Sequence, residues 1–255
     1  YNLYDYEYGI AVPGKVYDDY VKEHPGEEIS YNAPGNYYMT GMEWERPIYV
    51  EVFESNGSKV IDQAAGVRLS GGYSRVPDQK SLRLIARKKY DPDNGKFKYA
   101  FFNGAETQDG VPVSEYDRIV LRNGANDREF AGVRDELSQK LAQDYGYPVT
   151  QHCTPAAVFL NGEYYGFSWV HENYNDDYLA TYFGGNKENY EIISNTEDAD
   201  EGSERALADY AKVYEYYEKD LTDDKTFAEF CELVDIDNFM QYYAMEVFIA
   251  NKDWP

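Results

Sequence analysis

Basic residues are scarce in this chain of 255 residues, which has 24 lysines and arginines, 47 aspartates and glutamates and a formal net charge of -23. A protein that binds DNA or RNA through its phosphates needs basic residues that dominate a face of the domain. The acidic balance excludes such a surface, so we expect no nucleic-acid partner. The chain also has no run of about 18 apolar residues, and we expect no membrane span.

Cysteine and histidine are also rare. The two cysteines, Cys153 and Cys231, lie far apart and match no metal or redox spacing, so we interpret both as ordinary thiols. The three histidines form no His-Glu-x-x-His pattern, and no Gly-x-Ser-x-Gly turn presents a nucleophile. Neither a structural zinc site nor a Ser-His-Asp hydrolase is therefore expected.

Aromatic residues, by contrast, make up 17% of the chain, with 28 tyrosines. Amphipathic aromatics on this scale favour a globular domain over a solvated acidic tail. High acidity with abundant Tyr and Asn fits a secreted or cell-surface bacterial protein, which is the location we expect. Because the chain does not begin with Met, we also expect it to be part of a larger multidomain protein.

One segment departs from the acidic background. Residues 66–90 (GVRLSGGYSRVPDQKSLRLIARKKY) hold seven of the 24 basic residues and one acid, Asp78. The glycines permit a turn whose backbone amides approach an anion, and Arg75 and Lys80 can add charge-assisted hydrogen bonds. Since neither GxxxxGK[ST] nor GxGxxG is present, a phosphate site and a solvated basic edge strand both remain open.

The order of the predicted elements, strands first and helices later, indicates an α+β architecture. We expect an irregular segment over residues 1–45, a strand-rich part over 46–170 and a helical part over 171–255. Hairpins are predicted at 47–69 and 156–170, each around an Asn-Gly turn, with further strands at 82–87 and 116–122. Helices are predicted at 128–145, at 176–183, and from 204 to about 250, the last with breaks near 221–226 and at Asp235.

Two polar stretches are predicted to be loops. Residues 91–96 (DPDNGK) resemble the start of a calcium loop, but Phe102 stands where a bidentate Glu is required, so a plain turn is favoured. The acidic stretch 195–204 is predicted to be a loop as well.

Acidic side chains offer two further candidate sites. Glu43 and Glu45 flank Trp44, an arrangement compatible with glycoside hydrolysis, although a chain with 47 acids forms such pairs by chance. Near the end of the chain, Asp253 follows a predicted helix within NKDWP. Its carboxylate could accept a proton from an attacking hydroxyl or hold a metal, and a simple turn at the end of the helix is the alternative.

In combination, the motifs of this chain resemble the CotH family of spore-coat-type atypical protein kinases, in its bacterial extracellular branch. The motifs are GVRLSGGYSRVPDQKSLRL, YDRIVLRNG followed by VRDELSQKLA, VFLNGEYYGFSWVHE with DDYLATYFG, and NKDWP. The resemblance implies one domain over residues 1–255 with a distant protein-kinase-like, two-lobed fold. It also implies ATP and Mg²⁺ or Mn²⁺ as cofactors, with Ca²⁺ as an alternative, and phosphate transfer to Ser or Thr of secreted or coat proteins.

The resemblance assigns roles to basic and acidic residues. Lys80 matches the lysine that meets the ATP phosphates, and Arg75 lies in the preceding loop. Arg134 and Asp135 match the pair that opens the family's helix, and Asp135 is the candidate for orienting Lys80, as an acidic helix residue does in ordinary kinases.

The remaining roles fall later in the chain. His171 and Glu172 match the linker between the lobes and would line the adenine pocket. Asp253 matches the catalytic aspartate, which would position the substrate hydroxyl and accept its proton. In the family an Asn and a metal-binding Asp follow this residue, so we expect the natural protein to continue beyond Pro255 and to carry its metal ligands there. A catalytically inactive, kinase-like binding module and a carbohydrate-handling domain are the alternatives.

Overall fold

The computed structural model describes residues 3–30, 33–194, 198–201 and 204–252. The chain divides into two compact units. The first consists of Tyr1–Glu106, Gly110–Arg134 and His152–Asn173, and the second of Thr107–Asp109, Asp135–Gln151 and Tyr174–Pro255. Strands and helices are both present, which confirms the mixed α+β class. No helix in the described ranges is long and apolar enough to cross a lipid bilayer.

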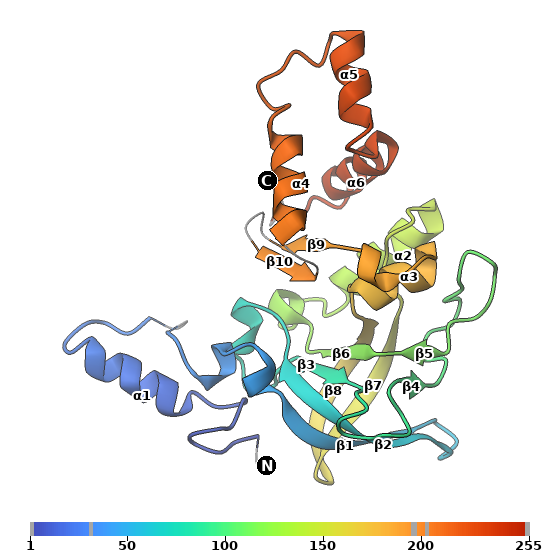
Figure 1. Cartoon of the computed structure of the whole chain (residues 1–255). Coiled ribbons are helices and arrows are strands. Elements are labelled where there is room, and N and C mark those ends of the chain that lie inside the picture. Colours follow the sequence, from blue (N-terminus) through green and yellow to red (C-terminus); the bar gives the residue numbers. More distant parts are fainter. Residues whose placement is uncertain (1–2, 31–32, 195–197, 202–203, 253–255) are drawn as a thin grey trace. The chain divides into compact units, whose positions relative to one another are not determined.

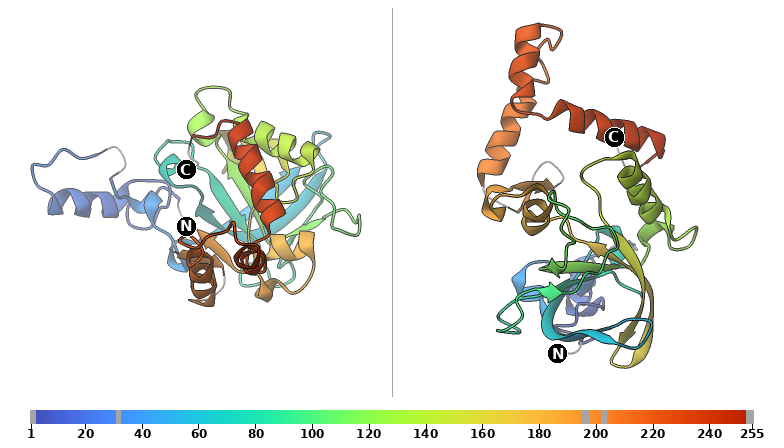
Figure 2. Two further views of the ribbon diagram at one scale, coloured as in Figure 1. Left: turned by 90° about the horizontal axis from the view of Figure 1, so that it is seen from above. Right: turned by 90° about the vertical axis from the view of Figure 1, so that its right-hand side faces the viewer.

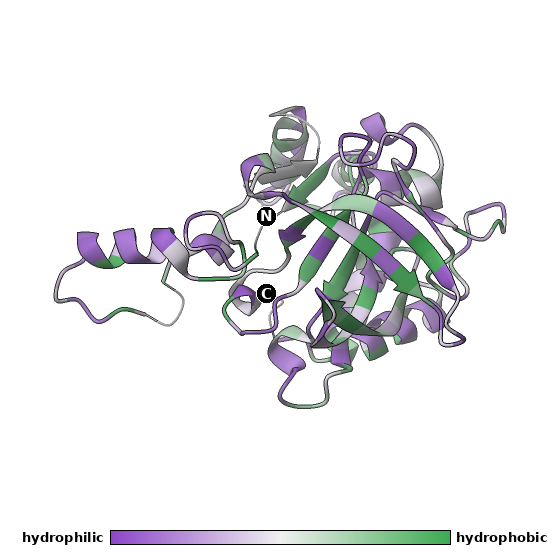
Figure 3. Cartoon of the chain, turned by 90° about the horizontal axis from the view of Figure 1, so that it is seen from below, coloured by the Kyte–Doolittle hydropathy of each residue, from purple (hydrophilic) through white to green (hydrophobic). Residues whose placement is uncertain are grey.

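The first unit is built on a six-stranded antiparallel sheet with the strand order β1-β2-β3-β6-β8-β7. The sheet is strongly curled (Figure 1, Figure 2). Its strands are β1 (Arg46–Phe53), β2 (Lys59–Leu69), β3 (Leu82–Ile85), β6 (Arg118–Arg122), β7 (Cys153–Leu160) and β8 (Glu163–Glu172), and β4 (Phe97–Lys98) pairs separately with β5 (Glu115–Tyr116). Hydrophilic and hydrophobic residues alternate along the strands, as Figure 3 shows, because successive side chains point to opposite faces. The buried face supplies the core, with Val67, Ile119 and Val170 among its members.

Both predicted hairpins are confirmed. In the turn between β1 and β2, Gly57 has φ 84° and the side-chain oxygen of Asn56 accepts a hydrogen bond from Ser58 N at 2.7 Å. Between β7 and β8, Asn161 and Gly162 have φ values of 52° and 84°. In the β7–β8 turn, positive φ at both central residues is what a tight two-residue hairpin requires, and Asn-Gly meets that requirement with little strain. The strands predicted at 82–87 and 116–122 are shorter, as β3 and β6.

The predicted turn at 91–96 and the predicted thiols are also confirmed. Oδ1 of Asp91 accepts hydrogen bonds from Asp93 N at 3.1 Å and Asn94 N at 3.2 Å, so the carboxylate closes a local turn. Cys153 and Cys231 are both free cysteines.

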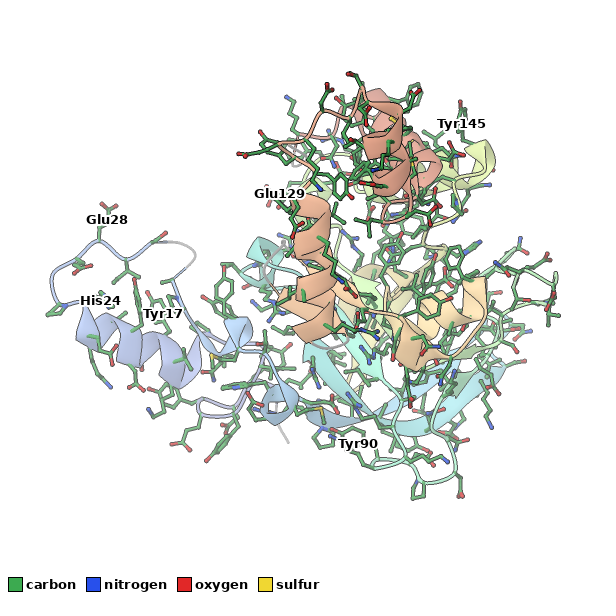
Figure 4. All side chains as sticks on the ribbon, turned by 45° about the horizontal axis from the view of Figure 1, so that its top comes forward. Tyr17, His24, Glu28, Tyr90, Glu129 and Tyr145 are labelled. Carbon is green, nitrogen blue, oxygen red and sulfur yellow. The ribbon has the colours of Figure 1, made fainter. Side chains whose placement is uncertain are left out.

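The N-terminal segment is more regular than we predicted. It contains helix α1 (Gly14–Glu23). Tyr17 lies in this helix and His24 directly follows its last residue (Figure 4). Pro13 directly precedes the helix, and Pro is compatible with a helix start, where its missing N–H is not needed. An ion pair between Lys15 and Asp19, one turn apart, adds local support.

A buried asparagine connects different parts of the N-terminal segment by hydrogen bonds. Asn36 is 1% exposed. Its Nδ2 donates to the carbonyl oxygens of Tyr6 and Gly9, each at 3.1 Å, and its Oδ1 accepts from Val16 N at 3.2 Å. Two separate stretches of backbone, residues 6–9 and the first turn of α1, therefore depend on one side chain.

Replacing Asn36 by alanine is expected to lower the free energy of unfolding by about 2 kcal/mol, because buried backbone groups lose their partners. Limited proteolysis should then cut within residues 3–30 sooner than in the wild-type protein. Asn103→Ala, at an exposed position, is the control and should change neither quantity. Equal cleavage rates in the two variants would contradict the role given to Asn36.

The second unit is mainly helical. Its elements are α2 (Arg134–Tyr145), α3 (Asp176–Phe183), α4 (Glu204–Tyr214), α5 (Asp224–Cys231), α6 (Ile236–Phe248) and a ribbon of β9 (Ile192–Ser194) with β10 (Asp198–Glu201). Side chains cap three of the helices: Asn175 accepts from Tyr178 N, Asp223 from Thr226 N and Asp235 from Asn238 N. The predicted boundaries of α3 and the predicted break at Asp235 are confirmed.

Two predictions in this part of the chain are wrong. The helix predicted from residue 128 begins at Arg134, because the Asp127 carboxylate caps the N–H groups of Val133 and Arg134 and Gly132 adopts φ 67°. The apolar period that predicts the helix includes Leu137, Leu141 and Ala142; of these only Ala142 is buried, and Glu136 is the other buried residue of the helix. The stretch 195–204 is not entirely a loop, since β10 lies within it; residues 195–197 and 202–203 are outside the described ranges.

Candidate phosphate-binding loop

The loop between β2 and β3, residues 70–81, contains both basic residues predicted to meet phosphate. It is closed by a hydrogen bond from Ser70 N to Ser81 O at 2.9 Å. Gly71 has φ 95°, and a β-carbon at this position would lie 2.3 Å from Ser74 Oγ, so the turn requires glycine. Lys80 stands two residues before β3, as the sequence predicted.

Lys80 is a buried cation. Its residue is 4% exposed, its Nζ donates to Val76 O at 2.9 Å, and the same atom lies 4.8 Å from the centroid of the Tyr37 ring. Burial lowers the pKa of Lys80, and the charge of Asp78 opposes that shift. An ammonium group has three N–H donors, so the bond to Val76 leaves it able to donate to a phosphate oxygen.

Arg75 makes a different set of contacts. Its guanidinium donates to four backbone carbonyl oxygens: Gly71 O, Leu69 O at 3.3 Å, Tyr37 O at 3.2 Å and Met39 O at 3.4 Å. These bonds tie the loop to the N-terminal segment, and burial lowers the pKa of Arg75. A phosphate-binding role for Arg75 stays a prediction.

Most other charges of the basic segment have a buried carboxylate as their partner. The side chain of Glu45 is 0% exposed, and it lies 2.8 Å from Arg68 Nη2, 3.1 Å from Arg87 Nε and 3.0 Å from Lys89 Nζ. The hydroxyl of Tyr90, labelled in Figure 4, donates to it at 2.9 Å. Burial raises the pKa of the Glu45 carboxyl, but hydrogen bonds from Lys89, Tyr90 and Arg87 outweigh it and lower the pKa to about 2. Three of the seven basic residues in this segment are therefore explained by their ion pairs with Glu45 and need no phosphate ligand.

The low pKa also bears on the carbohydrate alternative. A glycoside hydrolase needs one carboxylic acid that stays protonated near neutral pH, and such a group has a raised pKa. Glu45 is ionised and fully hydrogen-bonded instead, so it does not suit the role of a general acid.

His171 and Glu172, the predicted adenine-pocket residues, lie side by side at the end of β8, and their residues are 0% and 1% exposed. The Oε2 atom of Glu172 accepts hydrogen bonds from His152 N at 2.8 Å and from His152 Nδ1 at 3.0 Å. Burial together with the Glu172 charge raises the pKa of Tyr116. Glu172 thus anchors the segment that leads into β7, and its contact with adenine stays a prediction.

Two further acidic residues, Asp135 and Glu136, belong to the second unit. Asp135 and Glu136 stand in the first turn of α2, and each offers a carboxylate oxygen within 4.8 Å of the other. Two carboxylates at this spacing could hold a divalent cation, which prefers oxygen ligands. Arg134 pairs with Asp127 at 3.1 Å, and the pairing of Asp135 with Lys80 stays a prediction. Asp253, the predicted catalytic residue, lies outside the described residues.

Sequence reasoning missed the residues that support the loop. Asn123 is 5% exposed and follows β6 directly. Its Nδ2 donates to Gln79 O at 2.6 Å and its Oδ1 accepts from Ser81 Oγ at 2.9 Å, so it holds the loop on both sides of Lys80. The only signal in the sequence is its place in YDRIVLRNG, since the contact spans more than 40 residues.

The protein is therefore an α+β protein whose candidate phosphate site is a loop between two strands of an antiparallel sheet. The family model described as CotH kinase protein matches residues 67–255. The chain therefore belongs to the CotH kinase family, which confirms the resemblance seen in the motifs. A comparison with curated proteins finds no match.

Proposed function

We propose that this protein is an ATP-dependent kinase that transfers phosphate to Ser or Thr of secreted or coat proteins, on a distant two-lobed kinase-like fold. The observation that carries the proposal is Lys80, a buried cation at the end of a glycine-containing loop within the region matched by the family. Its ammonium group suits a phosphate oxygen in charge and in donor type. The family and the composition together support a location outside the bacterial cell.

The roles of the residues follow from their chemistry. Lys80 would bind and orient the phosphates of ATP, while Asp253 would hold the acceptor hydroxyl and take its proton. A divalent cation would offset the charge of the phosphates. The carboxylates of Asp135 and Glu136 fit such a cation, because hard divalent ions prefer oxygen donors.

Replacing Asp253 by asparagine tests the proposal. The protein is incubated with γ-labelled ATP, Mg²⁺ or Mn²⁺ and an acceptor protein rich in Ser and Thr. We expect transfer by the wild-type protein and a loss of about 100-fold or more in the variant, because the proton acceptor is gone. ATP affinity, measured by calorimetry, should be unchanged. Equal transfer by both proteins would contradict the assignment of Asp253.

A kinase-like binding module without catalysis is the second candidate. It is favoured by Arg75 and Glu172, whose side chains bond to backbone carbonyls and to His152 in the structure. ATP binding without transfer, over a range of acceptors and both metals, would support this candidate. The absence of ATP binding would exclude both.

A further inference from the structure

A tyrosine hydroxyl from β8 contacts the backbone on both sides of the Lys80 α-carbon. The hydroxyl of Tyr165 accepts a hydrogen bond from Lys80 N at 2.6 Å and donates to Lys80 O at 3.3 Å. The two residues are 85 positions apart in the sequence. A single oxygen atom therefore fixes the peptide groups that determine where the Lys80 side chain leaves the loop.

The local structure of β8 allows this approach. Gly166 has φ 149°, and a β-carbon there would lie 2.6 Å from Nε2 of Gln79. That amide instead donates to Phe167 O at 2.6 Å and reaches Ser168 Oγ at 3.4 Å. Because Gly166 has no side chain, the Gln79 amide can lie against β8 at this position, directly beside Lys80.

The Tyr165 hydroxyl is suited to make both bonds at neutral pH. Burial raises the pKa of Tyr165 to about 12, although the hydrogen bond from the Lys80 backbone opposes the shift. The hydroxyl therefore keeps its proton and can donate as well as accept. Its neighbour Tyr164 is 63% exposed and points away from these contacts, since successive side chains of a strand lie on opposite faces.

We propose that Tyr165 is a positioning residue that holds Lys80 where it can bind phosphate, with Gly166 and Gln79 as its support. This inference rests on the proposed function, because Lys80 is the phosphate ligand in it. Tyr165 touches no reacting group itself. It acts through the backbone of Lys80, and it links the hairpin motif NGEYYGFSWV to the basic loop.

The test compares Tyr165→Phe with Tyr164→Phe. Two quantities are measured: the dissociation constant of ATP with Mg²⁺, and the rate at which acetic anhydride acylates Lys80 in the nucleotide-free protein, read by mass spectrometry relative to the other lysines. For Tyr165→Phe we expect ATP affinity to fall about tenfold, because both hydrogen bonds that fix the Lys80 backbone are lost and the ammonium group is no longer held toward phosphate. The relative acylation rate of Lys80 should rise several-fold, because its burial is relaxed. Tyr164→Phe should alter neither.

A purely structural role would give a different result. If Tyr165→Phe lowers the urea midpoint but leaves ATP affinity and the Lys80 rate at wild-type values, the proposal is overturned. Gly166→Ala provides a second variant that keeps the hydroxyl, and it should raise the Lys80 rate by displacing Gln79. If the wild-type protein binds no ATP, the proposed function fails, while the Lys80 rate still reports whether Tyr165 positions the residue.

Discussion

Glu45→Gln should lower the free energy of unfolding at pH 7 by about 3 kcal/mol, the loss typical of a buried ion pair deprived of one partner. The substitution keeps the shape of the side chain but removes its charge. Arg68, Arg87 and Lys89 would then face a neutral amide in a site where the carboxylate is 0% exposed. Urea denaturation at pH 7 measures the change. Glu43→Gln, two residues away at an exposed position, is the matched control and should behave like the wild-type protein.

The dependence on pH distinguishes the charge from the shape of Glu45. Its pKa is about 2 in the folded protein, compared with 4.5 for the ordinary carboxyl, so the folded state binds the proton less readily than the unfolded chain. The stabilisation is therefore complete above the ordinary pKa and is lost as the pH falls from 4.5 towards 2. The gap in urea midpoint between the wild-type protein and Glu45→Gln should narrow over this range. A gap that is constant with pH would show that the charge of Glu45 is not responsible.

Lys80→Ala is expected to weaken ATP binding by about 30-fold, because a charge-assisted hydrogen bond to phosphate contributes about 2 kcal/mol. Calorimetry with ATP and Mg²⁺ measures the loss. Lys88→Ala removes the same charge from an exposed position of the basic segment, so it separates a specific contact from general attraction by the segment. We expect little change in that control.

Two results would oppose the assignment of Lys80. One is an equal, small loss of affinity in both lysine variants, which would mean that ATP is attracted only by the summed charge. The other is a variant that does not fold. Lys80→Ala should itself lower the urea midpoint, because a side chain that is 4% exposed loses its packing and the contact of Nζ with the Tyr37 ring. Lys80→Met, which keeps most of the volume without the charge, is therefore the second variant, and it should fold and lose ATP affinity to a similar extent.

Local signals in the sequence predicted many elements correctly. Asn161-Gly162 closes the β7–β8 hairpin, Asp235 caps α6 and Gly184 ends α3, because turns and caps depend on the conformational preferences of one or two residues. The same local reasoning failed at residues 128–133. There, capping by Asp127 and a glycine with positive φ delayed the start of the helix despite apolar periodicity.

The α+β class, the family and the position of Lys80 just before a strand could be predicted from the sequence, since these depend on patterns and motifs that are contiguous in the chain. The sequence could not predict which basic residues pair with Glu45 or that Tyr165 bonds to the Lys80 backbone, because both depend on the folded sheet. Glu45 lies 23 residues before Arg68, and Tyr165 lies 85 after Lys80. Such contacts arise when the sheet brings distant strands together, and the order of its strands is not contained in any local pattern.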